Sequence, residues 1–320
     1  MKITILDDYQ SVIKNLKAFQ LIKNYEVQIL HQSVTDEDKL VELLHDTSIL
    51  VLTRERTKIT KSLLSRLPQL RLISQTGKVS NHINVVDCTA ENVAVAEGIG
   101  SPIAPAELTW ALLLNTVRQI PQEIEAMKQG KWQIGLGDCI YGKTIGIWGY
   151  GKIGQRIAQF GKVFGAQIMV WGSESSRTKA LADGFVVAES KEYFFEHADI
   201  ISLHLRLNES TKEIVKQTDL ERMKPGATII NTARAELVEK NAIYNVLKSG
   251  KHLKVGVDVY ETEPIYDSNY DLLQFPTMVC TPHIGYVEKE SYELYFGKAF
   301  ENVVNFINGN PTNIANPEVL

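Results

Sequence analysis

The stretch from Thr144 to Arg177, TIGIWGYGKIGQRIAQFGKVFGAQIMVWGSESSR, decides the fold. Its pattern predicts a short apolar strand over 144–148, a glycine turn, an amphipathic helix and a second apolar strand over 167–171. Apolar side chains recur at helical spacing between the two strands, which gives the helix one face for a sheet. A strand, a helix and a strand in this order form one βαβ unit of a parallel sheet.

The turn in this stretch carries the pattern G-x-G-x-x-G, formed by Gly149, Gly151 and Gly154. The first glycine allows a tight turn, the second lets the backbone approach a pyrophosphate, and the third lets the helix pack on the strand. The helix N-terminus, with Lys152 and Ile153 in its first turn, points N–H groups at the phosphates. We predict a dinucleotide site here, with a structural glycine turn that holds no ligand as the alternative.

Length and composition exclude several classes of function. A chain of 320 residues is longer than a single hydrophobic core usually organises, so we expect two domains. A hydrophobic content of 44% and a net charge of -4 are typical of a globular enzyme and argue against a nucleic-acid or membrane partner. The N-terminus reads as a strand and not as a signal peptide. Three scattered cysteines predict no disulfide and no metal site, so we expect a cytoplasmic protein.

Strand-like and helix-like segments alternate along the chain, which predicts βαβ units and parallel sheets in both halves. Further strands are expected at 2–6, 26–30, 48–52, 71–74, 93–96, 185–187, 199–205, 228–231, 254–259 and 278–280. Further helices are expected at 36–45, 60–67, 106–119, 123–133, 190–197, 239–248 and 288–306. The helix at 106–119 is apolar nearly all round and is expected to be buried. The aromatic residues of 288–306 are expected to pack in a core.

The segment 98–105, GIGSPIAP, is rich in glycine and proline and marks the best domain boundary. The residues before it contain no G-x-G-x-x-G, but they contain a notable loop after the strand at 71–74. This loop includes Thr76, Gly77, Lys78 and Val79. Ligands of open α/β sheets bind beyond the carboxyl ends of strands, so we predict that the loop binds a small anion. An ordinary turn with a solvated lysine is the alternative.

Three residues after predicted strands of the second half could carry out chemistry: Arg234, Glu263 and His283. An arginine can bind a carboxylate through two parallel N–H bonds. A carboxylate bonded to one imidazole nitrogen fixes the tautomer of the ring, so the other nitrogen can donate a proton. Each residue alone could instead be a solvated charge or a packed histidine. His204 also ends a strand, and we interpret it as structural.

Together these residues resemble the D-isomer-specific 2-hydroxyacid dehydrogenase family over essentially the full chain. The family's motifs appear in the family's order, as GYGKIGQRIA, SLHLRLNEST, MKPGATIINTARAELV, GVDVYETEP and TPHIGY. The resemblance implies an NAD(P)-dependent oxidoreductase that interconverts a small D-2-hydroxy acid and its 2-keto acid by hydride transfer.

The resemblance also assigns roles to single residues. It implies that Arg234 contacts the substrate, that Glu263 pairs with His283, and that His283 donates the proton. Asp258 would contact the nicotinamide amide, and the loop at 76–79 would bind the substrate carboxylate through backbone amides. The remaining cofactor residues would be His204, Leu205, Arg206, Thr232, Ala233, Arg234, His283 and Gly285.

The architecture implied by the resemblance is α/β, with two Rossmann-like domains, parallel doubly wound sheets and an active-site cleft between the domains. A flavodoxin-like substrate-binding domain would comprise 1–100 plus 288–320, and the dinucleotide-binding domain would comprise 101–287. Family members are commonly homodimers, with the apolar helix after Ser101 near the dimer contact.

Two departures from the family pattern leave questions open. Gly172 stands where relatives that use NAD usually have an aspartate for the adenosine ribose. Glu174 could replace that aspartate, while Ser173 and Arg177 could surround a 2′-phosphate, so we expect NAD with NADP possible. Arg206 stands where relatives often have an apolar residue, and its role is open.

Two other functions compete with this interpretation. The chain could be an NAD(H)-sensing, corepressor-like protein on the same fold, or a dehydrogenase of another small anion such as formate or phosphite. The Glu263–His283 pairing favours a hydroxy acid over formate. The identity of the 2-hydroxy acid and the physiological direction stay open.

Overall fold

The stretch 144–177 folds as predicted in the computed structural model, which describes all residues 1–320. Strand β6 (Thr144–Trp148) leads through the glycine turn into helix α6 (Lys152–Val163), and strand β7 (Gln167–Trp171) follows. The two strands pair in parallel, with Thr144 opposite Gln167. Both strand predictions are confirmed to the residue, because the apolar pattern and the flanking glycines are purely local signals.

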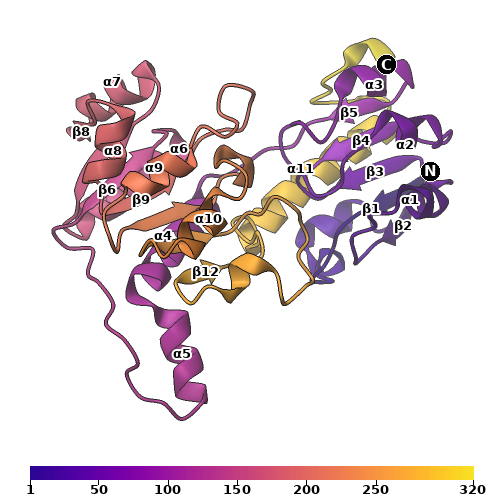
Figure 1. Cartoon of the computed structure of the whole chain (residues 1–320). Helices are drawn as coiled ribbons and strands as arrows, with labels where there is room; N and C mark the ends of the chain where they lie inside the picture. Colours follow the sequence, from indigo (N-terminus) through magenta and orange to yellow (C-terminus); the bar gives the residue numbers. More distant parts are fainter. The chain divides into compact units, whose positions relative to one another are not determined.

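The chain divides into two compact units (Figure 1). One comprises Met1–Ser101 and Glu288–Leu320, and the other comprises Pro102–Val287. The chain therefore leaves the first unit once and returns to it for the last helix. The roles expected for these two parts of the chain stay predictions.

The unit Pro102–Val287 is built on a seven-stranded parallel sheet in the order β12-β11-β10-β9-β6-β7-β8. Its other strands are β8 (Val186–Val187), β9 (Ile200–Leu203), β10 (Thr228–Asn231), β11 (Lys254–Val257) and β12 (Met278–Cys280). From β6, the strands β7 and β8 follow on one side of the sheet, and the chain then returns to place β9, β10, β11 and β12 in order on the other side. The topological switch point, where such sheets bind ligands, therefore lies beside the turn after β6.

Helices cover both faces of this sheet, so the sheet is doubly wound. Besides α6, the unit contains α4 (Ile103–Arg118), α5 (Ile120–Lys128), α7 (Glu174–Ala182), α8 (Lys191–His197), α9 (Gln217–Arg222) and α10 (Ala242–Lys248), with short 3₁₀ helices η3 (Ala235–Leu237) and η4 (Asp271–Gln274). Neighbouring residues of β10 point to opposite faces. Ile230 packs in the cluster formed by α4 and α6, and Ile229 packs in the cluster formed by α8, α9 and α10.

The other unit has a five-stranded parallel sheet in the order β2-β1-β3-β4-β5, a flavodoxin-like order. Its strands are β1 (Lys2–Ile5), β2 (Glu26–Ile29), β3 (Ile49–Leu52), β4 (Leu72–Gln75) and β5 (Ala94–Ala96). Its helices are η1 (Ile13–Asn15), η2 (Lys17–Leu21), α1 (Glu37–Leu44), α2 (Lys61–Ser65), α3 (Val85–Ala90), α11 (Lys289–Ile307) and η5 (Pro317–Val319).

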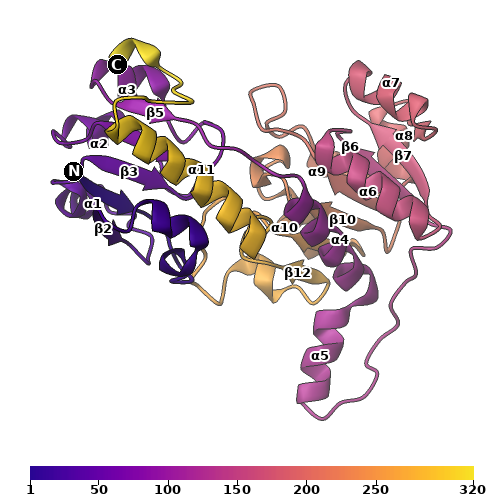
Figure 2. The same ribbon diagram turned by 180° about the vertical axis from the view of Figure 1, so that it is seen from behind.

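Helix α11 lies across this sheet and contacts β4 and η2 (Figure 2). The hydroxyl of Ser74 in β4 donates to the carbonyl of Ala299 at 2.8 Å. The predicted aromatic packing is confirmed for four rings, which are buried: Tyr292, Tyr295, Phe296 and Phe300. The fifth, Phe306, is only half-buried near the end of the helix.

The sequence misplaced the helices around residue 119. Helix α4 begins at Ile103 and not at 106, and α5 spans Ile120–Lys128 and not 123–133. Gln119 adopts a left-handed backbone with φ 55°, which ends α4 and lets a new helix start immediately, with Pro121 in its first turn. Similarly, Asn241 at φ 60° delays α10, which begins at Ala242 and not at 239.

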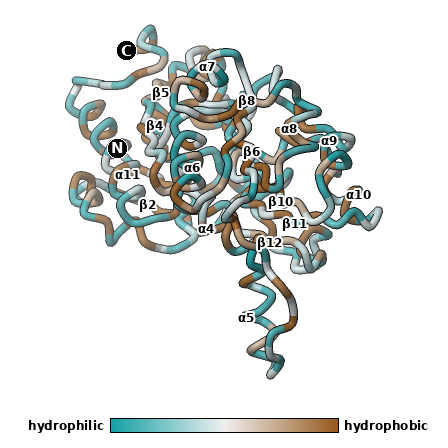
Figure 3. Tube along the Cα trace, turned by 90° about the vertical axis from the view of Figure 1, so that its left-hand side faces the viewer, coloured by the Kyte–Doolittle hydropathy of each residue, from teal (hydrophilic) through white to brown (hydrophobic).

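The segment that contains α5 exposes many apolar side chains. Helix α5 projects from the sheet of its own unit, and the chain beside it contains hydrophobic stretches (Figure 3). The largest exposed apolar residues here are Ile124, Met127, Trp132, Ile134 and Leu136. Within the predicted span 106–119 of α4, the apolar residues Ala106, Trp110, Leu112, Leu113 and Val117 are buried as expected, while Ala111 is exposed.

Three further features concern membrane spans, cysteines and metal-binding groups. No helix is both long and apolar enough to cross a membrane. The cysteines Cys88, Cys139 and Cys280 are free. No group of three or more His, Cys, Asp or Glu side chains is arranged to hold a metal ion.

Candidate active site

The glycine turn after β6 has the geometry of a phosphate cradle. Gly149 has φ 99°, and a Cβ at that position would lie 2.7 Å from the carbonyl oxygen of His204. A Cβ at Gly154 would collide with the carbonyl oxygen of Gly149, so both positions exclude any larger residue. Gly151 is the N-cap of α6 and faces open space, where a Cβ would meet no atom within 4 Å. The N–H groups at the start of α6 are thus open to an anion, and the residues present fit a dinucleotide pyrophosphate.

The loop after β7 contains a carboxylate that suits the ribose of NAD and also hydroxyl and guanidinium groups that suit the 2′-phosphate of NADP. Gly172 has φ 150° and offers no carboxylate at the end of the strand. Ser173 caps α7 by accepting the N–H of Ser176 at 3.3 Å. Glu174 begins α7 and is exposed, while the guanidinium of Arg177 lies 5.1 Å from the ring centroid of Trp171. Hydroxyls, a carboxylate and a guanidinium all lie at this position, so the geometry selects neither NAD nor NADP.

His204 follows β9 and is built into the sheet edge. Its N–H donates to the carbonyl of Trp148 at 2.8 Å, and its Nε2 lies 2.9 Å from the hydroxyl of Ser202. Burial lowers the pKa of His204 to about 4, so the ring is neutral at physiological pH. Leu205 packs against the hydrophobic cluster of the sheet, and Arg206 is exposed. The structural interpretation of His204 fits these contacts.

The lowered pKa of His204 predicts a pH dependence of stability. In the unfolded chain His204 binds a proton at about pH 6.5, whereas in the folded chain it does so only near pH 4. The contribution of His204 to the free energy of unfolding is therefore fully present above about pH 6.5. The free energy of unfolding is expected to fall by up to about 3 kcal/mol as the pH drops from about 6.5 to about 4. In His204→Gln, denaturant unfolding at a series of pH values should show a flatter acid limb than in the wild type. Parallel curves for the two proteins would contradict the prediction.

The loop after β10 is organised by Asn231, a residue that the sequence analysis did not single out. Its Nδ2 donates to the carbonyl of Arg234 at 2.9 Å, and its Oδ1 accepts the N–H of Ala233 at 3.0 Å. The half-buried Arg234 also donates from Nη1 to the carbonyl of Ala233 at 2.6 Å. Thr232 lies 2.6 Å from Thr109 through the two hydroxyls. An asparagine that ends an otherwise apolar strand, TIIN, was the signal in the sequence.

Glu263 and His283 lie together, as predicted. Oε2 of Glu263 lies 2.6 Å from Nδ1 of His283, and its Oε1 accepts the N–H of Tyr260 at 2.9 Å. Burial acts to raise the pKa of Glu263, but the bond to His283, the N–H of Tyr260 and the charge of Arg234 bring it below its usual value. About a third of each side chain is exposed. With Nδ1 engaged by the carboxylate, Nε2 of His283 is the nitrogen left for proton transfer.

Asp258 holds the loop that carries His283. It is fully buried, and Oδ1 accepts the Thr281 hydroxyl at 2.7 Å and the N–H of Ile284 at 2.8 Å. Oδ2 accepts the N–H of Gly285 at 2.9 Å. Burial raises the pKa of Asp258 against these bonds. The structure therefore assigns Asp258 a positioning role, and its expected contact with the nicotinamide stays a prediction.

The predicted anion loop belongs to the unit that contains β4. Thr76 is buried, and its hydroxyl donates to the carbonyl of Leu52 at 2.9 Å. The carboxylate of Glu97 accepts hydrogen bonds from Nζ of Lys78 at 2.8 Å and from the backbone N–H of Val79 at 3.0 Å. Two of the donors proposed for a substrate anion are thus engaged by a residue of the chain itself. Burial acts to raise the pKa of Glu97, but the bonds from Lys78 and from the N–H of Val79 bring it below its usual value.

The sequence analysis also missed Arg54 in this unit. A Cβ at Gly77 would lie 2.5 Å from Nη1 of Arg54, so the guanidinium packs directly on the predicted loop. It also lies 5.1 Å from the ring centroid of Tyr295. An arginine immediately beyond a buried strand, next to the strand of the loop, was the available signal. The binding role of Thr76, Gly77, Lys78 and Val79 stays a prediction.

Known proteins support the same interpretation of the chain. The family model described as D-isomer specific 2-hydroxyacid dehydrogenase, NAD binding domain, matches residues 110–285. A glyoxylate reductase of Thermococcus litoralis is 33% identical over 306 residues, which cover 91% of this chain and 87% of that protein.

Longer relatives match as well. A D-3-phosphoglycerate dehydrogenase of Bacillus subtilis is 31% identical over 295 residues, which cover 91% of this chain but only 55% of that protein. The chain thus spans about half the length of this curated relative. A crystal structure of a phosphoglycerate oxidoreductase from Vibrio cholerae O395 is 55% identical, with a TM-score of 0.95, and the match covers 97% of this chain and 99% of that one.

Proposed function

The chain belongs to the D-isomer specific 2-hydroxyacid dehydrogenase family, and from this premise we propose that it is an NAD(P)-dependent oxidoreductase. The proposed reaction interconverts a small D-2-hydroxy acid and its 2-keto acid. The observation that carries the proposal is the 2.6 Å contact between Glu263 and His283, with the charge of Arg234 acting on the same carboxylate.

Each of these residues has a distinct task in the proposal. His283 holds a proton on Nε2 and donates it to the substrate oxygen during reduction, or accepts it during oxidation. Glu263 fixes the orientation of the imidazole and stabilises its charged form. Arg234 binds the substrate carboxylate with its planar, always charged guanidinium. Bound NAD(P)H supplies the hydride in this chemistry.

The cofactor residues are proposed from the cradle and the strand ends around it. Gly149, Gly151 and Gly154 admit the pyrophosphate, and the first turn of α6 at Lys152 and Ile153 faces it. NAD is the proposed cofactor, with Glu174 as acceptor for the adenosine ribose. NADP remains possible because Ser173 and Arg177 lie in the same loop.

A spectrophotometric screen tests both the reaction and the cofactor. Oxidation of NADH and of NADPH is followed in parallel with a panel of 2-keto acids that includes glyoxylate and hydroxypyruvate. We expect turnover with at least one acid and a higher kcat/KM with NADH. In Glu174→Ala the KM for NADH should rise while the KM for NADPH does not. Nucleotide binding without turnover of any 2-keto acid would instead support the NAD(H)-sensing alternative, and turnover of formate or phosphite alone would support the other one.

We also propose a homodimer formed through the surface around α4 and α5, together with a cytoplasmic location. The exposed apolar side chains of α5 and of the segment after it would be covered by a second copy. Light scattering after size-exclusion chromatography should give twice the chain mass. Ile124→Asp, at a position that is 51% exposed, should shift the protein to a monomer without loss of helicity. Leu181→Asp, at a position of α7 that is 61% exposed, serves as the control and should leave the dimer intact, because α7 packs on β7 and β8 and not beside α5. A monomeric wild type would contradict the proposal.

A further inference from the structure

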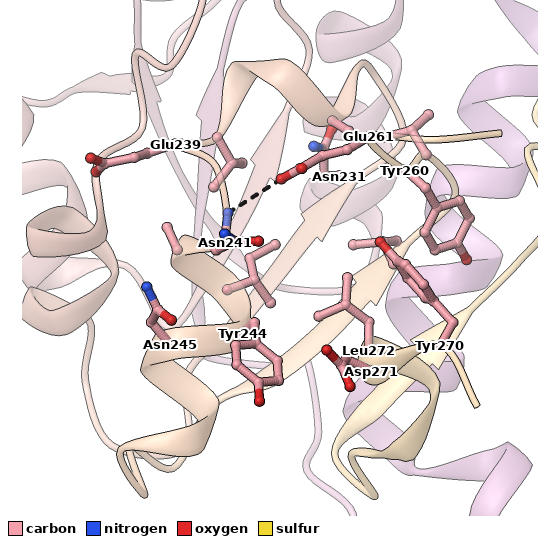
Figure 4. A pocket seen from close by; sticks show the side chains of 16 residues that line it. Asn231, Glu239, Asn241, Tyr244, Asn245, Tyr260, Glu261, Tyr270, Asp271 and Leu272 are labelled. Atoms are coloured by element: carbon pink, nitrogen blue, oxygen red, sulfur yellow. Dashed lines mark hydrogen bonds between the residues drawn. The ribbon is translucent and has the colours of Figure 1, made fainter. Parts of the chain in front are cut away.

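The unit Pro102–Val287 contains a cavity of about 300 Å³ that the proposed reaction does not use. It lies at the ends of β10 and β11, between α10 and the segment that leads into η4 (Figure 4). Its buried wall is formed by Val238, Ala242, Val257 and Val259. The volume is at the lower end of the range for ligand pockets, so it suits a small molecule.

The charged groups of the cavity are all negative. Glu239, Glu261 and Asp271 line it, and no lysine, arginine or histidine does. Such a surface repels phosphates and carboxylates. The cavity is therefore suited neither to a dinucleotide nor to a 2-keto acid.

Two of these carboxylates accept backbone N–H groups. Oε1 of Glu261 accepts the backbone N–H of Asn241 at 3.2 Å, the bond drawn in Figure 4. Oε2 of Glu239 accepts the backbone N–H of Gln217 at 2.9 Å. Backbone donors satisfy one oxygen of each group without cancelling its charge, and Asp271 is exposed at the rim.

Three aromatic rings line the same cavity, those of Tyr244, Tyr260 and Tyr270. Tyr260 and Tyr270 meet edge to face, with ring centroids 6.0 Å apart. Burial raises the pKa of both phenols, so both rings stay neutral. Lys248 does not line the cavity, but its Nζ donates to the Tyr244 hydroxyl at 2.9 Å, lies 5.1 Å from the centroid of that ring and interacts with the charge of Asp271. A ligand cation would therefore compete with Lys248 at Tyr244 and Asp271, and would meet no such cation at Tyr260, Tyr270 and Glu261. Faces of neutral aromatic rings attract organic cations, most strongly where water is partly excluded.

We propose that this cavity binds a small organic cation, a primary ammonium group on a short apolar or aromatic body, and that the bound cation alters catalysis through Tyr260. The apolar wall would accept the body of the ligand, and the carboxylates and tyrosine rings would accept its charge. Neither Arg234 nor a glycine of the pyrophosphate cradle lines the cavity, although Asn231 and Ala235, which flank Arg234 in the chain, do.

Tyr260 connects the cavity to both members of the catalytic pair. Its ring lines the cavity, while its N–H donates to Oε1 of Glu263 at 2.9 Å. Its hydroxyl donates to the carbonyl of Thr281 at 2.9 Å, two residues before His283. A ligand that moves Tyr260 therefore moves the partners of Glu263 and of the His283 loop. This second half of the proposal rests on the proposed function, because it requires turnover to be observed.

Binding is tested with three probes of one size and different charge: benzylammonium, benzyl alcohol and benzoate. Calorimetry on the full chain measures their affinities and requires no turnover, so its outcome is independent of the proposed reaction. Benzylammonium should bind at least about tenfold more tightly than benzyl alcohol, and benzoate should not bind. Equal affinities of benzylammonium and benzyl alcohol, or no binding of benzylammonium, would overturn the proposal.

Substitutions of lining residues test whether benzylammonium binds in this cavity. Asp271→Asn removes a lining charge, and Tyr244→Leu removes a lining ring; each should weaken benzylammonium about fivefold. Glu236→Gln is the matched control, because Glu236 is an exposed carboxylate of η3 that does not line the cavity. It should leave the affinity unchanged. An equal loss in Glu236→Gln and Asp271→Asn would indicate attraction by net charge alone and overturn the site.

Coupling is tested by kinetics with saturating benzylammonium. The wild type should change its kcat/KM for a 2-keto acid by at least about fivefold, the lower end of typical coupling between sites. Tyr260→Phe keeps the ring but loses the hydroxyl bond to Thr281. It should still bind the probe within about twofold of the wild type, yet respond to it less. Binding without any kinetic change in the wild type would overturn the coupling.

Discussion

Replacing His283 with glutamine is expected to lower kcat by about 10³-fold, with little change in cofactor affinity. Glutamine can fill the space of the imidazole, but it cannot hold or release a proton near neutral pH. The loop that carries residue 283 is held by the backbone N–H groups of Ile284 and Gly285 on Asp258, which the substitution does not remove, so the fold should persist. Steady-state kinetics on the substrate found by the screen measures kcat, and fluorescence titration measures NADH affinity. An unchanged kcat would exclude His283 as the proton donor.

Glu263→Gln separates the positioning of His283 from its proton transfer. It should lower kcat at least about tenfold, less than His283→Gln, because the imidazole remains. The lowered pKa of Glu263 means that its carboxylate charge, and the charge-assisted bond to His283, are fully present above the usual glutamate range. Both are lost as the pH falls through the lowered value. The kcat of the wild type should therefore decline as the pH falls below the usual glutamate range and Glu263 is protonated. The pH profile of Glu263→Gln should lack this decline. Identical pH profiles would contradict the assigned role of Glu263.

Replacing Arg234 with glutamine is expected to lower kcat/KM by about 10²- to 10³-fold, the loss that follows removal of one partner from a hydrogen-bonded charge pair. The larger part should be a higher KM for the 2-keto acid. A smaller part should be in kcat, since Arg234 also helps to keep the pKa of Glu263 low.

Arg234→Lys is the control for charge alone. Lysine keeps the positive charge but offers a point donor and not a planar fork, so its kcat/KM should lie between those of the wild type and Arg234→Gln. Cofactor affinity should stay within about threefold of the wild type in both variants if the arginine acts mainly on the substrate. A KM for the 2-keto acid that does not change in Arg234→Gln would show that the carboxylate binds elsewhere.

The candidate catalytic residues could be named from the sequence because each stands in a short pattern just beyond a strand. Parallel strands deliver their carboxyl ends to one edge of a sheet, so Arg234 after β10, Glu263 after β11 and His283 after β12 had to approach one another. The 2.6 Å contact between Glu263 and His283 agrees with that expectation. Their partners were not predictable in the same way. Asn231 reads as the last residue of a strand, and nothing local indicates that its amide binds the loop of Arg234.

The helix boundaries around Gln119 and Asn241 show where local patterns fail. Both residues adopt the left-handed conformation. Glutamine is a good helix former, so nothing local indicated the break at Gln119, whereas asparagine enters this region more readily. Their backbones follow the path that the chain must take between packed elements. The periodic pattern continues through both points, and only the packed structure shows that α4 ends at Gln119 and that α10 begins after Asn241.

The sequence by itself determined the βαβ unit around Gly149, the parallel sheets and the three catalytic candidates. These features arise from the strand period, from glycine's freedom to turn, and from the rule that strand ends meet at one edge. Only the tertiary structure decided that Glu97 engages Lys78 and Val79, that Asp258 supports the His283 loop, and that three carboxylates and three tyrosines enclose a cavity. Each of these depends on residues far apart in the chain, and contacts of that kind have no local signal because they form only when separate elements pack.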